Sequence, residues 1–142
     1  MAIQDIMTSR VVTVHMDDPL SVIRDIFAST TFHHLLVVEE NSLKGVISDR
    51  DLLKALSPFV DTHAERQRDR ATLDRKAYQI MTRDLITIGP NNSITSAITL
   101  FNRHRISCLP VVDASHTPLG IVTWRDILRY AEKQVQIKKA EE

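Results

Sequence analysis

Apolar side chains change their spacing several times along this chain, and the changes predict short strands between amphipathic helices. Runs of branched apolar residues are typical of buried strands, whereas apolar residues three and four positions apart are typical of one helix face. The predicted strands are 11–14, 34–38 and 43–47, and the predicted helices are 20–27 and 48–56. Asp17, Asp18 and Pro19 precede the first helix, as an acidic N-cap and a first-turn proline would. The predicted order is β-α-β-β-α.

The same pattern then occurs a second time. Ile6-Met7-Thr8 is followed 74 positions later by Ile80-Met81-Thr82, and Gly45-Val46-Ile47-Ser48 is followed 75 positions later by Gly120-Ile121-Val122-Thr123. Chance does not keep so many apolar, glycine and hydroxyl positions in register, so the chain contains two copies of one unit. The expected fold class is α/β (α+β), with one repeat at 1–58 and the other at 77–137.

Two segments lie outside the repeats. Residues 59–76 are dense in charges of both signs, which favours a solvated linker or surface helix, with docking of a partner as the alternative. Residues 138–142 form a polar tail that is expected to fray, because the final helix is expected to extend only towards Gln134.

Composition limits the possible partners and the compartment. The 142 residues include 18 basic and 18 acidic ones, which argues against binding to nucleic acid or to a membrane surface. Cys108 is the single cysteine, which excludes an intrachain disulfide and fits a reducing compartment. The N-terminus lacks the apolar core of a signal peptide, and no apolar run approaches the roughly 18 residues of a membrane span. We therefore expect a cytoplasmic protein.

A hydroxyl residue and an aspartate three positions later stand where the last helix of each repeat begins. These pairs are Ser48 with Asp51 and Thr123 with Asp126. One interpretation is a capping box, which satisfies the free N–H groups of a helix start. The other is a ribose site, because one carboxylate can accept from both neighbouring ribose hydroxyls. The helix N-terminus and the adjacent Arg50 or Arg125 would then suit a phosphate.

The doubled unit resembles the tandem CBS (cystathionine-β-synthase-type) domain pair, also called a Bateman module. The resemblance depends on Gly45–Asp51 and Gly120–Asp126, on Asp5–Thr8 and Gln79–Thr82, and on 104–112. It implies two sheets packed face to face about a pseudo-twofold axis, with two clefts between them, and assembly as a homodimer. It also implies sensing of an adenosine-containing molecule, such as AMP, ADP, ATP, NAD or S-adenosylmethionine, and regulation of an unknown partner protein.

Matching the family residue by residue gives each cleft its own side chains. The first cleft would contain Thr8, Val12, Phe32, His33, Ile121, Thr123, Arg125 and Asp126. The second would contain Thr82, Ile86, Ile106, Ser107, Val46, Ser48, Arg50 and Asp51. Alternatives stay open here, because Val12 and Ile86 are equally consistent with plain core, and Thr8 and Thr82 with the end of a helical turn.

This chain departs from the family at two adjacent histidines, His33 and His34. Members that bind nucleotide phosphates often carry a His-Arg pair here, but this chain has His34 and Cys108 in place of the arginine. The departure favours a monophosphate or a plain adenosyl group over a triphosphate. His33 could still bind a phosphate when protonated, so the cleft containing it is expected to prefer a phosphorylated ligand. The alternative is one solvated histidine and one at the edge of the core. Adjacent strand residues point to opposite faces, so the pair is not expected to chelate a metal.

Three functions follow from these residues. The leading one is a regulatory module that binds adenine nucleotides, and the first alternative is a ligand-free module for dimerisation. The second alternative, a small enzyme using His33, His34 and Cys108, is disfavoured because no GxSxG, Walker or HExxH motif is present. Cys108 is instead expected to be a buried thiol. Trp124 is expected at an interface or over a cleft.

Overall fold

The computed structural model describes residues 1–141, which fold into two compact units of mixed α and β structure. The central unit is Val12–Leu85, and the terminal unit combines Met1–Val11 with the chain from Ile86 onward. The tandem α+β repeats expected from the sequence are confirmed, but the compact units are offset from them. Residues 1–11, which begin the first repeat, belong to the terminal unit together with the end of the second repeat. Residues 77–85, which begin the second repeat, belong to the central unit together with the end of the first.

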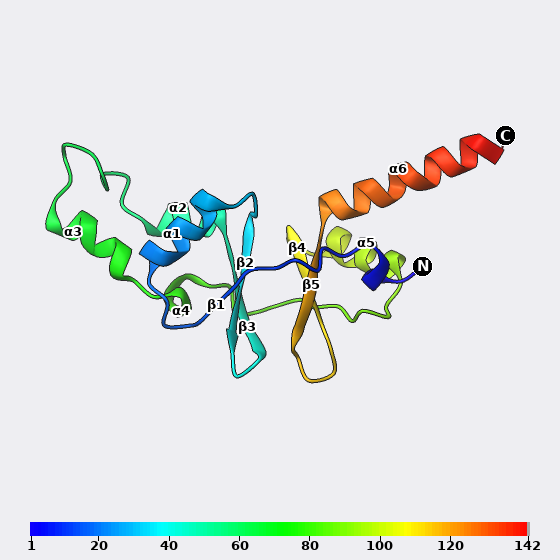
Figure 1. Cartoon of the computed structure of the whole chain (residues 1–142), viewed down its shortest axis with the longest axis horizontal. Helices are drawn as coiled ribbons and strands as arrows, with labels where there is room; N and C mark the ends of the chain where they lie inside the picture. The colour runs from blue at the N-terminus through cyan, green and yellow to red at the C-terminus, as the bar shows by residue number, and fades with distance from the viewer. Residues whose placement is uncertain (142) are drawn as a thin grey trace. The chain divides into compact units, whose positions relative to one another are not determined.

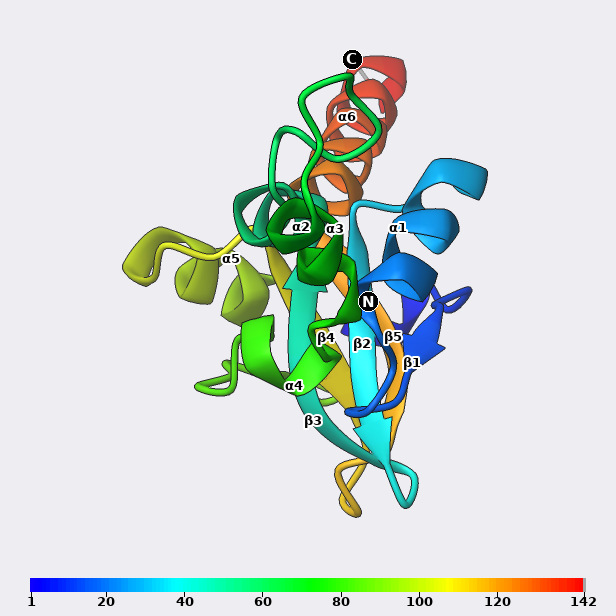
Figure 2. The same ribbon diagram turned by 90° about the vertical axis from the view of Figure 1, so that its left-hand side faces the viewer.

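The central unit is a three-stranded sheet covered by helices (Figures 1 and 2). Strands β1 (Thr13–Val14), β2 (His34–Glu39) and β3 (Ser42–Ser48) lie in that order, with β1 parallel and β3 antiparallel to β2. Glu40 and Asn41 make the tight β2–β3 turn with φ angles of 51° and 64°. Its helices include α1 (Leu20–Ser29), α2 (Asp49–Ala55) and α4 (Ala77–Ile80).

The core of the central unit forms where α1 and α2 pack on the sheet. Leu20 and Ile23 from α1 meet Leu35 and Val37 from β2, and all four are fully buried. Burying an aliphatic side chain of this size stabilises the fold by about 1.5–3 kcal/mol. The predicted alternation of strand and helix is therefore confirmed in this unit.

The terminal unit repeats this plan with fewer strands. A short helical turn, η1 (Ile3–Asp5), lies beside α5 (Ile94–Arg103), and β4 (Cys108–Val112) pairs antiparallel with β5 (Pro118–Thr123) (Figure 1). The run 86–88, which the repeat predicts as a strand, makes only one parallel bridge, from Ile88 to Val111. The core of the terminal unit is built in the same way, from Ile3, Ile94, Leu109 and Val122.

Two predicted helix boundaries were wrong. Pro19, not an aspartate, is the N-cap of α1, because the Asp18 carboxylate accepts instead from the His15 backbone N–H at 2.8 Å. The final helix, α6, runs from Trp124 to Glu141, well past Gln134. Residues 138–141 are therefore helical rather than frayed, and the last residue of the predicted tail lies outside the described residues. Between residues 1 and 141, no helix combines the length and apolar character needed to cross a membrane.

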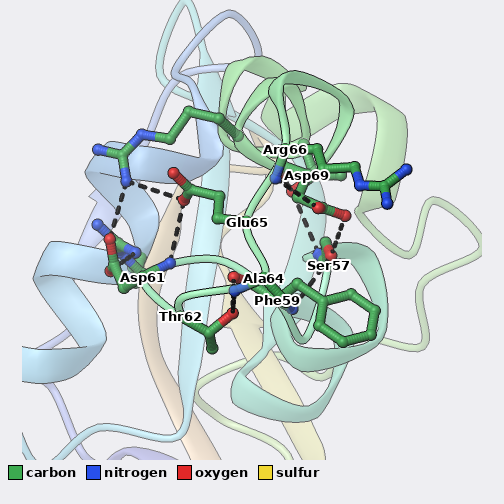
Figure 3. A network of polar contacts seen from close by, with 11 residues as sticks. Ser57, Phe59, Asp61, Thr62, Ala64, Glu65, Arg66 and Asp69 are labelled. Atoms are coloured by element: carbon green, nitrogen blue, oxygen red, sulfur yellow. Dashed lines mark hydrogen bonds and ion pairs between the residues drawn. The ribbon is translucent and has the colours of Figure 1, made fainter.

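The charged segment between the repeats is folded onto the central unit. It forms α3 (Gln67–Arg70) and a helical turn, η2 (Ala71–Asp74), and Leu73 in that turn is buried. The Asp69 carboxylate accepts from the Ser57 hydroxyl and from the Arg66 backbone N–H, both at 2.8 Å (Figure 3). Asp61 pairs with Arg24 of α1 at 3.0 Å. The segment is thus a structured part of the central unit rather than a free linker.

Candidate functional site

The first predicted pair, Thr123 and Asp126, forms a polar cluster at the start of α6. The Asp126 carboxylate accepts from the Thr123 backbone N–H at 2.9 Å and from the Thr123 hydroxyl at 3.2 Å. Its other oxygen accepts from the Thr8 hydroxyl at 3.2 Å. Asp126 is only 5% exposed, so it is a buried acceptor held by three donors at a strand-to-helix junction.

Thr8 reaches this junction because the N-terminal segment pairs with β5. The Thr8 N–H donates to the Ile121 carbonyl at 2.8 Å, and the Ile121 N–H donates to the Thr8 carbonyl at 2.9 Å. Gly120 permits the approach, since a Cβ there would lie 2.7 Å from the Thr8 carbonyl oxygen. We call Thr8, Ile121, Thr123 and Asp126 the terminal half-site.

The equivalent cluster in the central unit is simpler. The Ser48 N–H donates to Asp51 at 2.9 Å and the Asp51 N–H donates to the Ser48 hydroxyl at 3.0 Å, which is the capping box that the sequence predicted as one alternative. Thr82 pairs with Val46 through two backbone hydrogen bonds of 2.9 and 3.1 Å. Within residues 1–141, no hydrogen bond joins the Thr82 hydroxyl to Asp51. We call Val46, Ser48, Asp51 and Thr82 the central half-site.

Each predicted cleft is divided between the two compact units. Ile121, Thr123, Arg125 and Asp126 share the terminal unit with Thr8, whereas Val12, Phe32 and His33 lie in the central unit. Val46, Ser48, Arg50 and Asp51 share the central unit with Thr82, whereas Ile86, Ile106 and Ser107 lie in the terminal unit. The structure therefore brings together four residues of each predicted set near a helix start, in part through backbone pairing, and Arg50 and Arg125 are exposed.

The two adjacent histidines have different environments. His33 is exposed, and its Nδ1 lies 2.8 Å from the Asp49 carboxylate, which lowers the pKa of Asp49 through that hydrogen bond. His34 at the start of β2 is half-buried, and desolvation lowers its pKa. The alternative of one solvated histidine and one at the core edge matches these positions.

The groups considered for catalysis or metal binding offer little chemistry. Cys108 is buried, and desolvation raises the pKa of its thiol to about 12, so it is a neutral thiol near pH 7. No group of three or more metal-ligating side chains occurs among residues 1–141.

One feature of the terminal unit was missed from the sequence. A groove of about 280 Å³ lies between the N-terminal segment and α6, and Thr8 and Asp126 line it together with Arg129, Tyr130 and Lys133. Arg129 and Lys133 follow Asp126 by three and seven positions, so they share its helix face. That spacing was readable from the sequence, but the opposing N-terminal wall comes from residues more than a hundred positions away.

Comparison with known sequences identifies the family. The CBS domain model matches residues 3–58 and 77–133, and the chain belongs to this family. A CBS domain-containing protein of Dictyostelium discoideum is 30% identical over 128 residues, covering 89% of this chain and 88% of its own. Protein MJ1404 of Methanocaldococcus jannaschii is 31% identical, and the match covers 89% of this chain but only 42% of that protein.

Solved CBS domain pairs share the fold. The pair of protein MJ0100 in complex with 5′-methylthioadenosine and S-adenosyl-L-methionine has a TM-score of 0.77 at 26% identity, covering 94% of this chain and 98% of its own. CBSX2 in complex with AMP has a TM-score of 0.76 at 25% identity, covering 96% and 98%. These similarities support a ligand-sensing module in general terms.

Proposed function

We propose that this protein is a regulatory module that binds an adenosine-containing ligand and passes the signal to a partner protein. The observation that carries the proposal is the terminal half-site, where a buried carboxylate and two threonine hydroxyls meet at a helix start. Solved relatives that hold AMP, S-adenosyl-L-methionine or 5′-methylthioadenosine support the adenosyl class.

The half-site suits a ribose because its acceptor is already placed and desolvated. Asp126 accepts from Thr8 and Thr123 at 3.2 Å, longer than the usual 2.7–2.8 Å of hydroxyl hydrogen bonds. Ribose hydroxyls would replace these long contacts with shorter charge-assisted ones, while the Thr123 N–H continues to orient the carboxylate. Ligand binding would thus replace two long hydroxyl contacts of Asp126 with shorter ones.

A regulatory rather than catalytic role also fits the larger relatives. Homoserine O-acetyltransferase of Methanococcoides burtonii matches this chain over only 24% of its own length. The similarity is thus confined to a minor part of that enzyme. We propose that this chain has no catalytic activity of its own.

The experiment is a thermal-shift panel of AMP, ADP, ATP, NAD, S-adenosylmethionine and adenosine, followed by calorimetry. We expect Asp126→Ala to lower the affinity for the confirmed ligand about ten- to a hundredfold, because a charge-assisted hydrogen bond contributes about 1.5–3 kcal/mol. Asp51→Ala tests the central half-site, and Asp25→Ala, an exposed aspartate of α1, is the control. If both half-site variants lose about 1 kcal/mol of stability but bind the ligand with unchanged affinity, the two aspartates act only as helix caps.

The ligand-free alternative is assembly through an exposed apolar face. Ile98, Trp124 and Leu128 are 37%, 60% and 68% exposed, and with Phe101 they line a hollow of about 300 Å³ on α5 and α6. A panel without hits, together with a homodimer in solution, would favour this function. We propose that the homodimer forms in either case, because assembly and ligand binding use different surfaces of the terminal unit.

A further inference from the structure

The groove between the N-terminal segment and α6 extends the terminal half-site along the helix. An α-helix rises 1.5 Å per residue, which places Arg129 about 4.5 Å and Lys133 about 10 Å beyond Asp126 along the axis. Tyr130 lies on the same wall, and Met7 and Thr8 line the opposite one. A ligand held at Asp126 would therefore have a cationic helix face beside its remaining part.

Both cations are available to a ligand. The Arg129 guanidinium lies 3.8 Å from the Asp126 carboxylate, which is beyond hydrogen-bond length, and its side chain is 66% exposed. Among residues 1–141, Arg129 has no closer polar partner, and Lys133 has neither a hydrogen bond nor an ion pair. Across the groove, the Asp5 carboxylate is engaged by the Ala2 backbone N–H at 2.7 Å.

We propose that this groove is a phosphate subsite, in which Arg129 binds the 5′-phosphate of a nucleotide whose ribose is held by Asp126. Lys133, one turn further, adds a second positive charge for that phosphate or for the next one in the chain. The inference rests on the proposed function and narrows its ligand class from adenosyl compounds to phosphorylated ones. Arginine suits this role because its planar donors match phosphate oxygens in pairs.

The central half-site lacks these features. Helix α2 ends at Ala55, four residues beyond Asp51, whereas α6 continues to Glu141. The position that corresponds to Arg129 is Lys54, and the one that corresponds to Lys133 is Pro58, outside the helix. The phosphate preference therefore belongs to the terminal half-site, and Lys54 provides a matched control.

The test is calorimetry on the full chain with AMP, adenosine and 5′-methylthioadenosine, which carries no charge on its 5′ substituent. The wild-type chain is expected to bind AMP at least about tenfold more tightly than either uncharged ligand. Arg129→Gln is expected to weaken AMP binding about ten- to a hundredfold and to change 5′-methylthioadenosine binding less than about twofold. Arg129→Lys should retain part of the preference, and Lys54→Gln should change neither affinity.

The outcomes separate this proposal from the proposed function. Equal wild-type affinity for AMP and 5′-methylthioadenosine would overturn the phosphate subsite while leaving an adenosyl site. An equal loss for both ligands in Arg129→Gln would also overturn it, because Arg129 would then act only on Asp126. If neither these three ligands nor the other compounds of the thermal-shift panel bind, the proposed function fails and the subsite fails with it. Thermal unfolding of Arg129→Gln checks that the variant is folded.

Discussion

At the scale of single residues, the two repeats place the same side chain in two environments. Asp126 accepts from two threonines that lie more than a hundred residues apart, whereas Asp51 makes only the contacts of a helix cap. The cap could be predicted, because it depends on residues three positions apart. Hydrophobic spacing does not show which repeat the N-terminal segment joins, and only the family resemblance placed Thr8 in one cleft with Asp126.

His34 gives the fold a dependence on pH. Burial lowers its pKa, so the folded chain favours the neutral imidazole more than the unfolded chain does. Stability is therefore fully present above the unfolded value of about 6.5 and falls as the pH decreases towards the lowered folded value. We expect a lower urea midpoint at about pH 5 than at about pH 8, and a smaller difference in His34→Gln. His63→Gln, at an exposed position, should behave like the wild type.

At the scale of elements, the close approach of the N-terminal segment to β5 depends on Gly120. A methyl group there would meet the Thr8 carbonyl oxygen at 2.7 Å, and that oxygen is fixed by the Ile121 N–H. We expect Gly120→Ala to cost about 1–3 kcal/mol of unfolding free energy, as overpacking does, and to disturb the Thr8–Asp126 contact. Urea denaturation measures the cost. An unchanged midpoint would show that the N-terminal segment shifts freely.

The segment 57–76 shows what composition could not predict. Its mixed charges indicated a solvated linker or a surface helix, and the structure contains the short helix α3, in which Asp69 accepts from Ser57 and Arg66. Charge counts do not reveal such pairing, because it depends on which oxygen faces which donor. Only Leu73 indicated burial, and a single apolar residue among many charges did not outweigh them.

The Asp69 contacts predict acid sensitivity in this segment. The Ser57 hydroxyl, followed by the Arg66 N–H, lowers the pKa of Asp69. The contribution to stability is thus present above the unfolded pKa of about 3.9 and is lost as the pH falls through the lower folded value. We expect Asp69→Asn to be less stable than the wild type at neutral pH, with the difference shrinking below about pH 4. Hydrogen exchange of residues 57–76 would report the loss locally, and Asp74→Asn is the exposed control.

At the scale of the whole molecule, sequence reasoning went furthest where the pattern was doubled. The repeats, their element order and the two Ser/Thr-x-x-Asp junctions all depend on local spacing, and the structure contains them. The length of α6 was underestimated because its last turns are polar and have no apolar face to mark them. The groove was missed because its opposing wall comes from the N-terminal segment, more than a hundred positions before α6.

Assembly is the last property that the surface predicts. Leu53 and Leu128 correspond in the two repeats and are 75% and 68% exposed, so neither belongs to the core. Around Leu128 the face is apolar, and Phe101 and Trp124 meet edge to face at 6.4 Å. Around Leu53, Arg24 and Asp49 occupy the positions that correspond to Ile98 and Trp124 in the other repeat. Burying these charged side chains in an interface would cost free energy.

We therefore expect the α5–α6 face to join two copies about a twofold axis, where one patch packs against itself. Light scattering should give twice the 16.2 kDa mass of the chain at micromolar concentrations. Leu128→Asp should raise the dimer dissociation constant at least about tenfold, or about 1.4 kcal/mol, and change monomer stability by less than about 0.5 kcal/mol. Leu53→Asp should leave the mass unchanged. A dimer that resists Leu128→Asp but dissociates with Leu53→Asp would assign the interface to the central unit instead.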